Sequence, residues 1–477
     1  MKRFLLILAS ATAGCTMAPK YVRPEAPVPP SWPVGDAYLK QAEAALPILS
    51  YRDVFADTRL QQIVEQALAN NRDLRIAAAN IASARAQYRI NRADIFPQVG
   101  ASGSYTYADN GGNGGNGTFS TSNSRYTADV GTTAFELDLF GRLRSLSDAA
   151  LQRYFATEAA ARATRLTLIG DIADAWLTYA ADQSLLRIAQ DTAVSAERSV
   201  RLTRLRLEGG IAPRTDLRQA EQILTTAQSD LAEQRTALAQ DMNALQLLVG
   251  APVDSALLPA SIEEVAKTIR ELPAGLDSGI LLRRPDVVQA EYELRAATAE
   301  IGAARAALFP RISLTGLAGF ASTALSSLFT GGAFNYSAGA DVSYSIFNAG
   351  GLRAGVAQSR AQREAALATY ERAIQAAFRD VSDGLARRGT IAEQLRADRA
   401  ATEAARDTYN LTEARYRGGI EPFLTSLDAQ RSLYAAQRRY VATQLVGASN
   451  LVTLYRALGG DALAAQDGTD RSTSPRD

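Results

Sequence analysis

Residue types that usually carry catalysis are scarce in this chain. Its 477 residues include no His and a single Cys, Cys15. Without imidazole the chain cannot build a Ser-His-Asp or Cys-His nucleophile, or a His-rich catalytic zinc site. One Cys also excludes an internal disulfide and a four-cysteine zinc or iron–sulfur site. The composition therefore disfavours an enzyme, and we expect no cofactor and no metal.

A short group of charged residues could still carry chemistry. Asp428 and Arg431 follow Leu424 by four and seven residues, so on a helix all three lie on one face. From the spacing alone we prefer an ordinary ion pair on a solvated helix, worth a few tenths of a kcal/mol. The chain as a whole has 51 Lys and Arg against 50 Asp and Glu. This near-neutral balance offers no general attraction for nucleic acid.

Cys15 stands where an acyl chain could be attached. Met1-Lys2-Arg3, an apolar run over 4–9 and small residues up to Gly14 have the layout of a secretory signal peptide. Cleavage before Cys15 would make it the new N-terminus, as in bacterial lipoproteins. Such signals usually place Leu three residues before the Cys, where this chain has Thr12. The other interpretation is therefore an incidental Cys in an ordinary signal peptide. We prefer lipidation, followed by an extended Pro-rich tether over 19–33.

The rest of the chain contains one design twice. The Phe96–Pro97 pair recurs as Phe309–Pro310, and Gly209–Ile211 recurs as Gly418–Ile420, each about 210 residues later. The order is the same in both halves, and the small change in spacing fits a difference in loop length. We infer two repeats of one ancestral unit.

Each repeat is predicted to begin with a helix, a strand, a Gly-rich loop and a second strand. The helix is Ala-rich and stops at the Phe-Pro pair, and the strands alternate apolar with small polar residues. These elements are expected at 58–93, 99–107, 108–125 and 126–140 in the first repeat, and at 285–308, 312–320, 321–336 and 337–347 in the second.

A long helix without proline follows each strand pair, over 142–207 and 351–417. At 1.5 Å per residue, about 65 residues give a helix about 100 Å long, too long for a compact core. Each helix ends at a Gly-Gly-Ile-x-Pro turn, where Gly permits left-handed backbone and Pro restarts a helix. The turn residues are Gly209, Gly210 and Pro213 in the first repeat and Gly418, Gly419 and Pro422 in the second.

The return helices, expected over 215–249 and 423–458, carry a coiled-coil signal. A sustained 3.5-residue period specifies a coiled coil, and small Ala lets helices approach closely. The first helix has Leu217, Leu224, Leu231, Leu238 and Leu245 at intervals of seven, with Ala220, Ala227 and Leu248 in companion positions. The second keeps the spacing less strictly, with Leu427, Tyr434, Val441, Ala448 and Tyr455.

Four strands cannot close a barrel within one chain, and an open sheet edge cannot face lipid because its backbone groups would be unsatisfied. Three chains would supply about twelve strands, enough for a closed barrel. We therefore expect a mainly α fold with a small β part: an outer-membrane β-barrel with four strands per protomer, continued by an α-helical coiled-coil barrel.

The motifs resemble the TolC-like outer-membrane efflux protein family, in particular its lipoprotein branch that serves resistance-nodulation-division (RND) pumps. The resemblance covers nearly the whole mature chain, in order, through both repeats. Besides Cys15, the matching segments are 19–24 (PKYVRP), 93–97 (ADIFP), 136–144 (ELDLFGRLR), 282–287 (LRRPDV), 414–419 (ARYRGG) and 424–433 (LTSLDAQRSL).

This resemblance implies a homotrimeric duct, anchored by lipid in the outer membrane, with a tunnel extending into the periplasm. The duct would passively conduct drugs or other small toxic compounds from an inner-membrane RND transporter, through a periplasmic adaptor protein, to the exterior. The expected organisation is a signal peptide (1–14), a lipid-anchored tether (15–57), two efflux repeats (58–250 and 284–460), an equatorial linker (251–283) and a polar tail (461–477).

The resemblance also changes the interpretation of the charged helix face. In this family the tunnel closes at its periplasmic tip, and Leu424, Asp428 and Arg431 match the positions of that gate. Three symmetry copies of Asp428 would then form an acidic ring suited to cation binding and gating. Asp216, Arg415 and Tyr416 lie near the same tip and complete the expected network.

Two other functions remain as alternatives. A periplasmic coiled-coil adaptor lipoprotein also combines a lipid anchor with long helical hairpins, but it would carry small β-rich domains flanking one hairpin. Here the hairpin occurs twice and strands interrupt the helices once per repeat. The exit duct of a type I protein secretion system is the second alternative, since relatives of the family export proteins.

Overall fold

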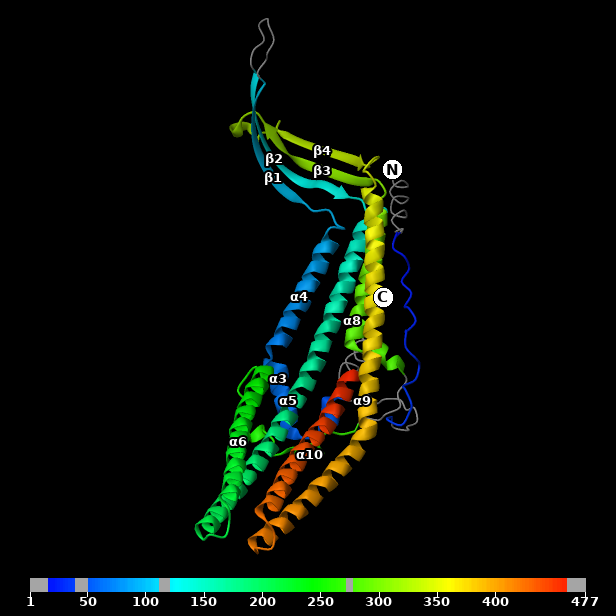
Figure 1. The fold of residues 1–477 in the computed structure, drawn as a ribbon. Helices are drawn as coiled ribbons and strands as arrows, with labels where there is room; N and C mark the ends of the chain where they lie inside the picture. Colours follow the sequence, from blue (N-terminus) through cyan, green and yellow to red (C-terminus); the bar gives the residue numbers. More distant parts are fainter. Residues whose placement is uncertain (1–15, 39–49, 111–120, 272–277, 461–477) are drawn as a thin grey trace. The chain divides into compact units, whose positions relative to one another are not determined.

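The computed structural model of the chain describes residues 16–38, 50–110, 121–271 and 278–460 (Figure 1). Cys15, the expected signal peptide and the expected polar tail lie outside these residues. The chain divides into two compact units, which interleave along the sequence. The first comprises residues 1–25, 80–158 and 289–370, and the second comprises residues 26–79, 159–288 and 371–477.

Secondary structure follows the duplicated order expected from the sequence. The first repeat contains α2 (Tyr51–Val54), α3 (Thr58–Asn70), α4 (Arg72–Ala93), β1 (Gly100–Asn110), β2 (Thr121–Glu136), α5 (Arg142–Glu208) and α6 (Arg214–Val249). Between the repeats lie η1 (Ser255–Leu257), α7 (Ile262–Val265) and η2 (Ser278–Arg283). The second repeat contains α8 (Pro285–Ala306), β3 (Arg311–Ser322), η3 (Leu325–Ser327), β4 (Phe334–Ser343), α9 (Gly351–Arg417) and α10 (Phe423–Ala457). The predicted mainly α fold with a small β part is confirmed.

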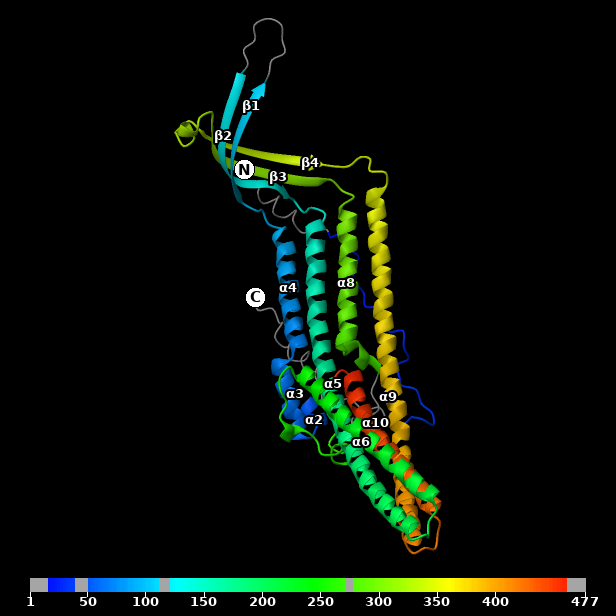
Figure 2. The ribbon, with the colours of Figure 1, turned by 60° about the vertical axis from the view of Figure 1, so that its left-hand side comes forward.

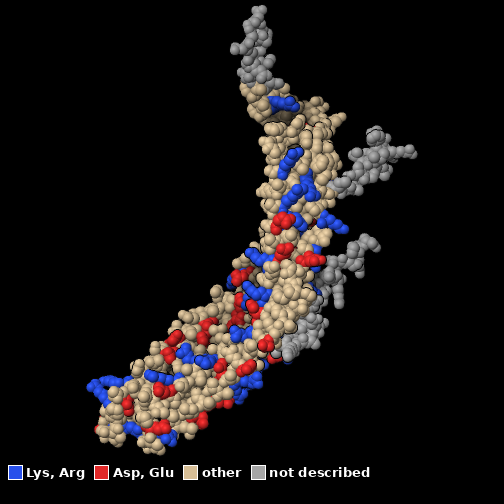
Figure 3. All heavy atoms as spheres, turned by 45° about the vertical axis from the view of Figure 1, so that its right-hand side comes forward, with Lys and Arg blue, Asp and Glu red and all other residues tan. Residues whose placement is uncertain are grey.

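The first unit holds one antiparallel sheet with the strand order β1-β2-β3-β4 (Figures 1 and 2). Its register places side chains of one kind opposite each other. Tyr105 faces Tyr126, and Ala318 lies between Val130 and Tyr336. One face of the sheet is therefore mainly apolar and the other carries mostly Ser, Thr, Gly and Asp, with Leu317 and Arg125 as exceptions. On the face drawn in Figure 3, the strands at the top of the view carry few charged side chains.

A β-bulge in β2 keeps its apolar side chains on the apolar face as far as the end of the strand. The apolar residues of β2 occupy even positions up to Val130, but Phe135 is odd. The register shifts between Thr132 and Phe135, where Ala134 has φ 57°. The shift pairs Phe135 with Leu314 and returns it to the apolar face.

The ends of the strands differ from the expectation. The ladder between β1 and β2 extends through polar residues to the pair Asn110 and Thr121, because backbone bonds need no apolar side chain. The expected strand to residue 140 ends instead at Glu136, since the Asp138 carboxylate accepts hydrogen bonds from the N–H groups of Leu143 (3.1 Å) and Arg144 (2.9 Å). Residues 137–141 thus form the capped entry to α5.

The second unit contains the two helical hairpins, in which α6 returns along α5 and α10 returns along α9 (Figure 2). The seam predicted from the heptads is buried at Ala220, Ala227 and Leu245 of α6. Leu427, Val441, Ala448 and Tyr455 of α10 are buried as well. None of the described helices combines the length and the hydropathy that crossing a bilayer requires.

The helix expected over 58–93 is broken at Asn71, which separates α3 from α4. The Asn71 side chain is buried; its Oδ1 accepts a hydrogen bond from the Leu74 N–H (3.0 Å), and its Nδ2 donates to the Leu248 carbonyl (2.8 Å). The first bond is an N-cap for α4. The second ties the break to the end of α6.

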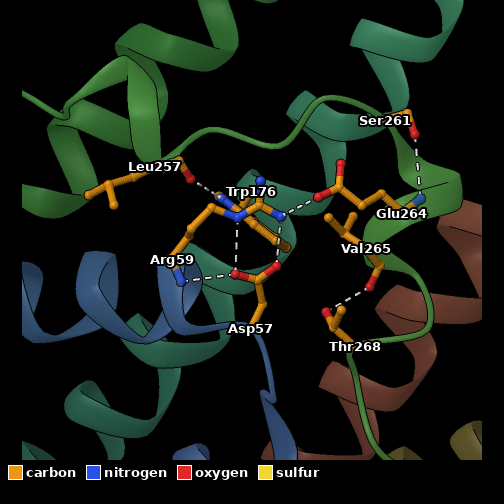
Figure 4. A network of polar contacts seen from close by, with 8 residues as sticks. All are labelled: Asp57, Arg59, Trp176, Leu257, Ser261, Glu264, Val265 and Thr268. Carbon is orange, nitrogen blue, oxygen red and sulfur yellow. Dashed lines mark hydrogen bonds and ion pairs between the residues drawn. The ribbon is translucent and has the colours of Figure 1, made fainter.

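A polar network joins the linker between the repeats to α3 and α5 in the second unit (Figure 4). Asp57 caps α3 and binds the Arg59 guanidinium (2.8 Å), which also reaches Glu264 of α7 (2.7 Å). Trp176 of α5 is fully buried and its Nε1–H donates to the Leu257 carbonyl (3.0 Å). These bonds fix the linker against the first repeat.

Candidate functional site

The two turns that join the hairpins have the same backbone geometry. Gly210 and Gly419 both have φ +74°, a left-handed conformation that strains any residue with a Cβ. In the first turn the Ile211 N–H donates to the Arg206 carbonyl (2.8 Å), and in the second the Ile420 N–H donates to the Arg415 carbonyl (2.9 Å). Both are Schellman motifs.

Gly209, Gly418 and the two prolines complete the turns without positive φ. Pro213 and Pro422 are the N-cap residues of α6 and α10. Each supplies extended backbone before the first helical turn, with ψ 156°. The repeated sequence motif thus produces two equivalent tips within the second unit.

An apolar cluster joins the two hairpins near their tips. Val200 of α5, Ala220 of α6 and the buried residues Tyr416, Phe423 and Leu427 of the second hairpin form it. The rings of Tyr416 and Phe423 lie 5.2 Å apart. Because residues from both repeats share this core, a movement of one hairpin tip would disturb the packing of the other.

Tyr416 is the predicted network residue that links the hairpins most directly. Its hydroxyl lies 3.2 Å from the Thr203 Oγ1 of α5. The Arg206 guanidinium lies 4.4 Å from the Tyr416 ring centroid and donates to the Tyr416 and Arg417 carbonyls, each at 3.0 Å. Arg206 thus places a cation at the C-terminal end of α9, where its charge favours the helix.

The other two members of the predicted network do not join the hairpins in the single chain. Arg415 forms an ion pair with Glu421 (2.6 Å), across the turn of its own hairpin. Asp216 lies in the first turn of α6, where its negative charge favours the helix N-terminus. Within the described residues, Asp216 forms no ion pair.

The three residues of the predicted gate share the exposed face of α10. Leu424, Asp428 and Arg431 are all exposed, while Leu427 between them is buried. Asp428 and Arg431 do not form the i,i+3 ion pair that their spacing permits, and neither has another charged partner in the described part of this chain. Neither charge is therefore neutralised by another charged group in the described part of this chain.

Arg431 also lines a cavity of about 190 Å³ between α5, α6 and α10. At this cavity the Tyr434 hydroxyl donates to Asp230 of α6 (2.7 Å). Burial and this hydrogen bond raise the pKa of Tyr434 to about 12. The bond connects the two return helices; the heptad pattern assigned Tyr434 to the seam but contained no signal for its partner Asp230.

The comparisons with known proteins agree over almost the whole chain. The outer membrane efflux protein family matches residues 63–251 and 277–460. The toluene efflux pump outer membrane protein TtgC and the antibiotic efflux pump outer membrane protein ArpC, both of Pseudomonas putida, are each 44% identical to the chain over 458 residues. Each of these alignments covers 96% of this chain and 94% of the relative.

A solved structure shows the same fold. The open state of the MtrE outer membrane channel of Neisseria gonorrhoeae superposes with a TM-score of 0.82 at 34% identity, covering 94% of this chain and 99% of that one. The resemblance to this family inferred from the motifs is confirmed. The chain therefore belongs to the outer membrane efflux protein family and is an outer-membrane efflux channel.

Proposed function

We propose that the chain assembles as a homotrimer whose sheets close into one twelve-stranded barrel in the outer membrane. The observation that carries this is the sheet itself. β1 and β4 are its edge strands, and open edges are not tolerated in lipid. Tyr336 and Val342 of β4 are 78% and 64% exposed on the apolar face. Copies of the chain would cover the edges and leave the apolar faces toward lipid.

The trimer would continue as a helical tunnel that receives its cargo from an inner-membrane RND transporter through a periplasmic adaptor. The relatives named for efflux of toluene and of antibiotics support small toxic organic compounds as the cargo. The proposed transport is passive, since a duct needs no catalytic group. Acylation of Cys15 would anchor the tether beside the barrel.

The proposed gate lies at the turns that join the long helices to their return helices. Three copies of the exposed face with Leu424, Asp428 and Arg431 would meet around the axis, where each Asp428 is free to pair with a neighbouring protomer. Tyr416 and Arg206 hold the two tips of each protomer together, so that opening moves them jointly. This arrangement also gives the two Schellman turns a role as rigid ends of the hairpins.

The gate is tested by single-channel recordings of the purified trimer in planar bilayers. Asp428→Ala combined with Arg431→Ala is expected to raise the closed-state conductance severalfold. The matched control is Arg399→Ala with Glu403→Ala, which removes an exposed ion pair of α9 (3.0 Å) with the same change in net charge. Unchanged conductance in the Asp428 and Arg431 variant would refute the gate assignment, and a monomer without conductance would refute the duct.

A further inference from the structure

A cavity of about 270 Å³ lies in the first unit between the tether and the helices α8 and α9. Its lining contains four cationic side chains, Lys20, Arg305, Arg360 and Arg363, and one carboxylate, Glu364. The proposed function as an efflux duct does not involve this pocket. Its charge and its place beside the tether indicate a ligand.

The tether is firmly attached where it forms one wall of the pocket. A Cβ on Gly302 of α8 would lie 2.7 Å from the Cβ of Ala18, so α8 approaches the tether as closely as glycine allows. Arg305 donates to the Met17 carbonyl (3.2 Å). The tether therefore forms a fixed wall of the pocket on this helix.

A second set of bonds holds the tether to the buried carboxylate of Glu291 on α8. Glu291 is 3% exposed and accepts two hydrogen bonds from Arg23 (3.0 and 2.8 Å) and one from the Tyr21 hydroxyl (3.1 Å). Arg295 also bonds to Glu291 (2.6 Å). The Glu291 charge is thus balanced by two guanidinium groups and does not neutralise the pocket.

The cations of the pocket are mostly without counter-charges. Arg363 pairs with Glu364 (2.7 Å). Among the residues that the structure describes, no carboxylate pairs with Lys20, Arg305 or Arg360. Three unpaired cations around one small cavity favour an anionic ligand, and guanidinium groups suit the oxygen atoms of a phosphate in particular.

The position of the pocket along the chain points to lipid as the source of that phosphate. Arg305 is in the last turn of α8, which ends at Ala306, and β3 begins at Arg311. Pro19 follows the predicted acylation site Cys15 by four residues, a span of at most about 14 Å. If the strands lie in the outer membrane as proposed, the pocket lies next to the headgroups.

We propose that this pocket binds the phosphate of an anionic phospholipid and so fixes the tether and the end of α8 at the membrane surface. The proposal rests on the placement of the strands in the outer membrane that is part of the proposed function. A lipid bound here would attach the tether to the membrane at a second point, in addition to the predicted acyl chain on Cys15. A single acyl chain by itself gives only marginal membrane binding.

The test is a lipid titration of the full-length assembled protein, followed by native mass spectrometry. The probes are phosphatidylglycerol, which is anionic, and phosphatidylcholine, which carries the same phosphate without net charge. We expect preferential retention of phosphatidylglycerol. Arg360→Gln removes a cation that makes no hydrogen bond to the tether residues that the structure describes, and it is expected to weaken this retention about fivefold.

Arg372→Gln is the matched control, since Arg372 is an exposed cation on the same helix, twelve residues away and outside the cavity. It should leave retention unchanged. An equal loss in both variants, or no preference for phosphatidylglycerol, would overturn the proposal. Displacement of the lipid by millimolar inorganic phosphate would also overturn it, in favour of a site for free phosphate.

Conductance recorded on the same preparations separates this inference from the proposed function. Wild-type trimers that conduct but do not prefer the anionic lipid would refute the lipid site alone. Trimers that do not conduct would refute the duct, whatever their lipid retention. Weaker retention in Arg360→Gln with normal conductance supports the lipid site within a functioning channel.

Discussion

Asp241 departs from the apolar seam that the leucine heptads of α6 indicate. The companion positions of this seam hold Ala220, Ala227, Gln234, Asp241 and Leu248 at intervals of seven. The Asp241 side chain lies beside that of Asp182 of α5, and among the described residues its Oδ2 is buried without a hydrogen-bond partner. Burial and the charge of Asp182 raise the pKa of Asp241 to about 7. Two carboxyl groups in one helix pair therefore share a proton near neutral pH.

This carboxyl pair predicts that the stability of the first hairpin depends on pH. The pKa of Asp241 is higher in the folded protein than in the unfolded chain. The contribution of protonated Asp241 to stability is therefore complete below about pH 4 and is lost as the pH rises through about 7. The thermal midpoint of the wild-type protein is expected to fall between pH 5 and pH 8. The chain contains no His, and burial also raises the pKa of Asp182, Asp174 and Glu293.

Asp241→Asn should remove most of that pH dependence and stabilise the protein at pH 8, because it replaces a half-buried carboxylate by a neutral amide. Since solvent screens a half-buried charge, we expect a gain of only about 1 kcal/mol. The measurement is the midpoint of thermal unfolding, followed by circular dichroism at about pH 5, 6, 7 and 8. Asp191→Asn, an exposed change on α5, serves as the control. If the thermal midpoint of Asp241→Asn fell with pH as steeply as that of the wild-type protein, the prediction would be contradicted.

At the scale of elements, Asn71 decides where one helix becomes two. The sequence over 58–93 contains no proline or glycine, so local propensity predicts a continuous helix. The break occurs because the Asn71 amide bonds to the start of α4 and to the end of α6 at once. The second partner is far away in the sequence, which is why no local pattern identifies the break.

Asn71→Ala is expected to cost about 2 kcal/mol, since it removes a helix cap and leaves the partly buried Leu248 carbonyl without its donor. Chemical denaturation monitored by circular dichroism measures the loss. The neighbouring exposed amide provides the control, because Asn70→Ala should change stability by less than about 0.5 kcal/mol. Equal effects of the two substitutions would show that Asn71 does not organise the break.

At the scale of the whole molecule, the proposed trimer requires β1 of one protomer to lie beside β4 of the next. Ser102 of β1 and Ser337 of β4 both lie on the polar face of the sheet. We expect Ser102→Cys, combined in turn with Ser337→Cys, Gly339→Cys or Asp341→Cys, to form covalent trimers on oxidation. Neighbouring strands lie about 4.8 Å apart, within reach of a disulfide.

The readout is the band pattern on non-reducing gels of outer membranes. Each variant with only one introduced cysteine should remain a monomer on the gel, since identical edges do not meet in the proposed ring. The double variant with the best register should give linked trimers that reducing agent dissolves. Absence of linked species from all three double variants would exclude the proposed closure.

Much of the architecture could be predicted from local patterns. The two repeats, the long helices and the Gly-Gly-Ile-x-Pro turns agree with the structure because period, helix breakers and left-handed glycines act over a few residues. The bounds of α9 agree to the residue. The strand ends were less predictable, since pairing of the backbone continued through polar residues as far as Asn110 and Thr121.

The sequence alone determined the family, the mainly α fold and the helix face that holds Leu424, Asp428 and Arg431, because these follow from order and spacing along the chain. Only the tertiary structure decided which groups meet. It placed Arg206 against Tyr416, Tyr434 against Asp230 and the tether against Gly302. Such contacts depend on the packing of segments distant in sequence, which no local pattern encodes.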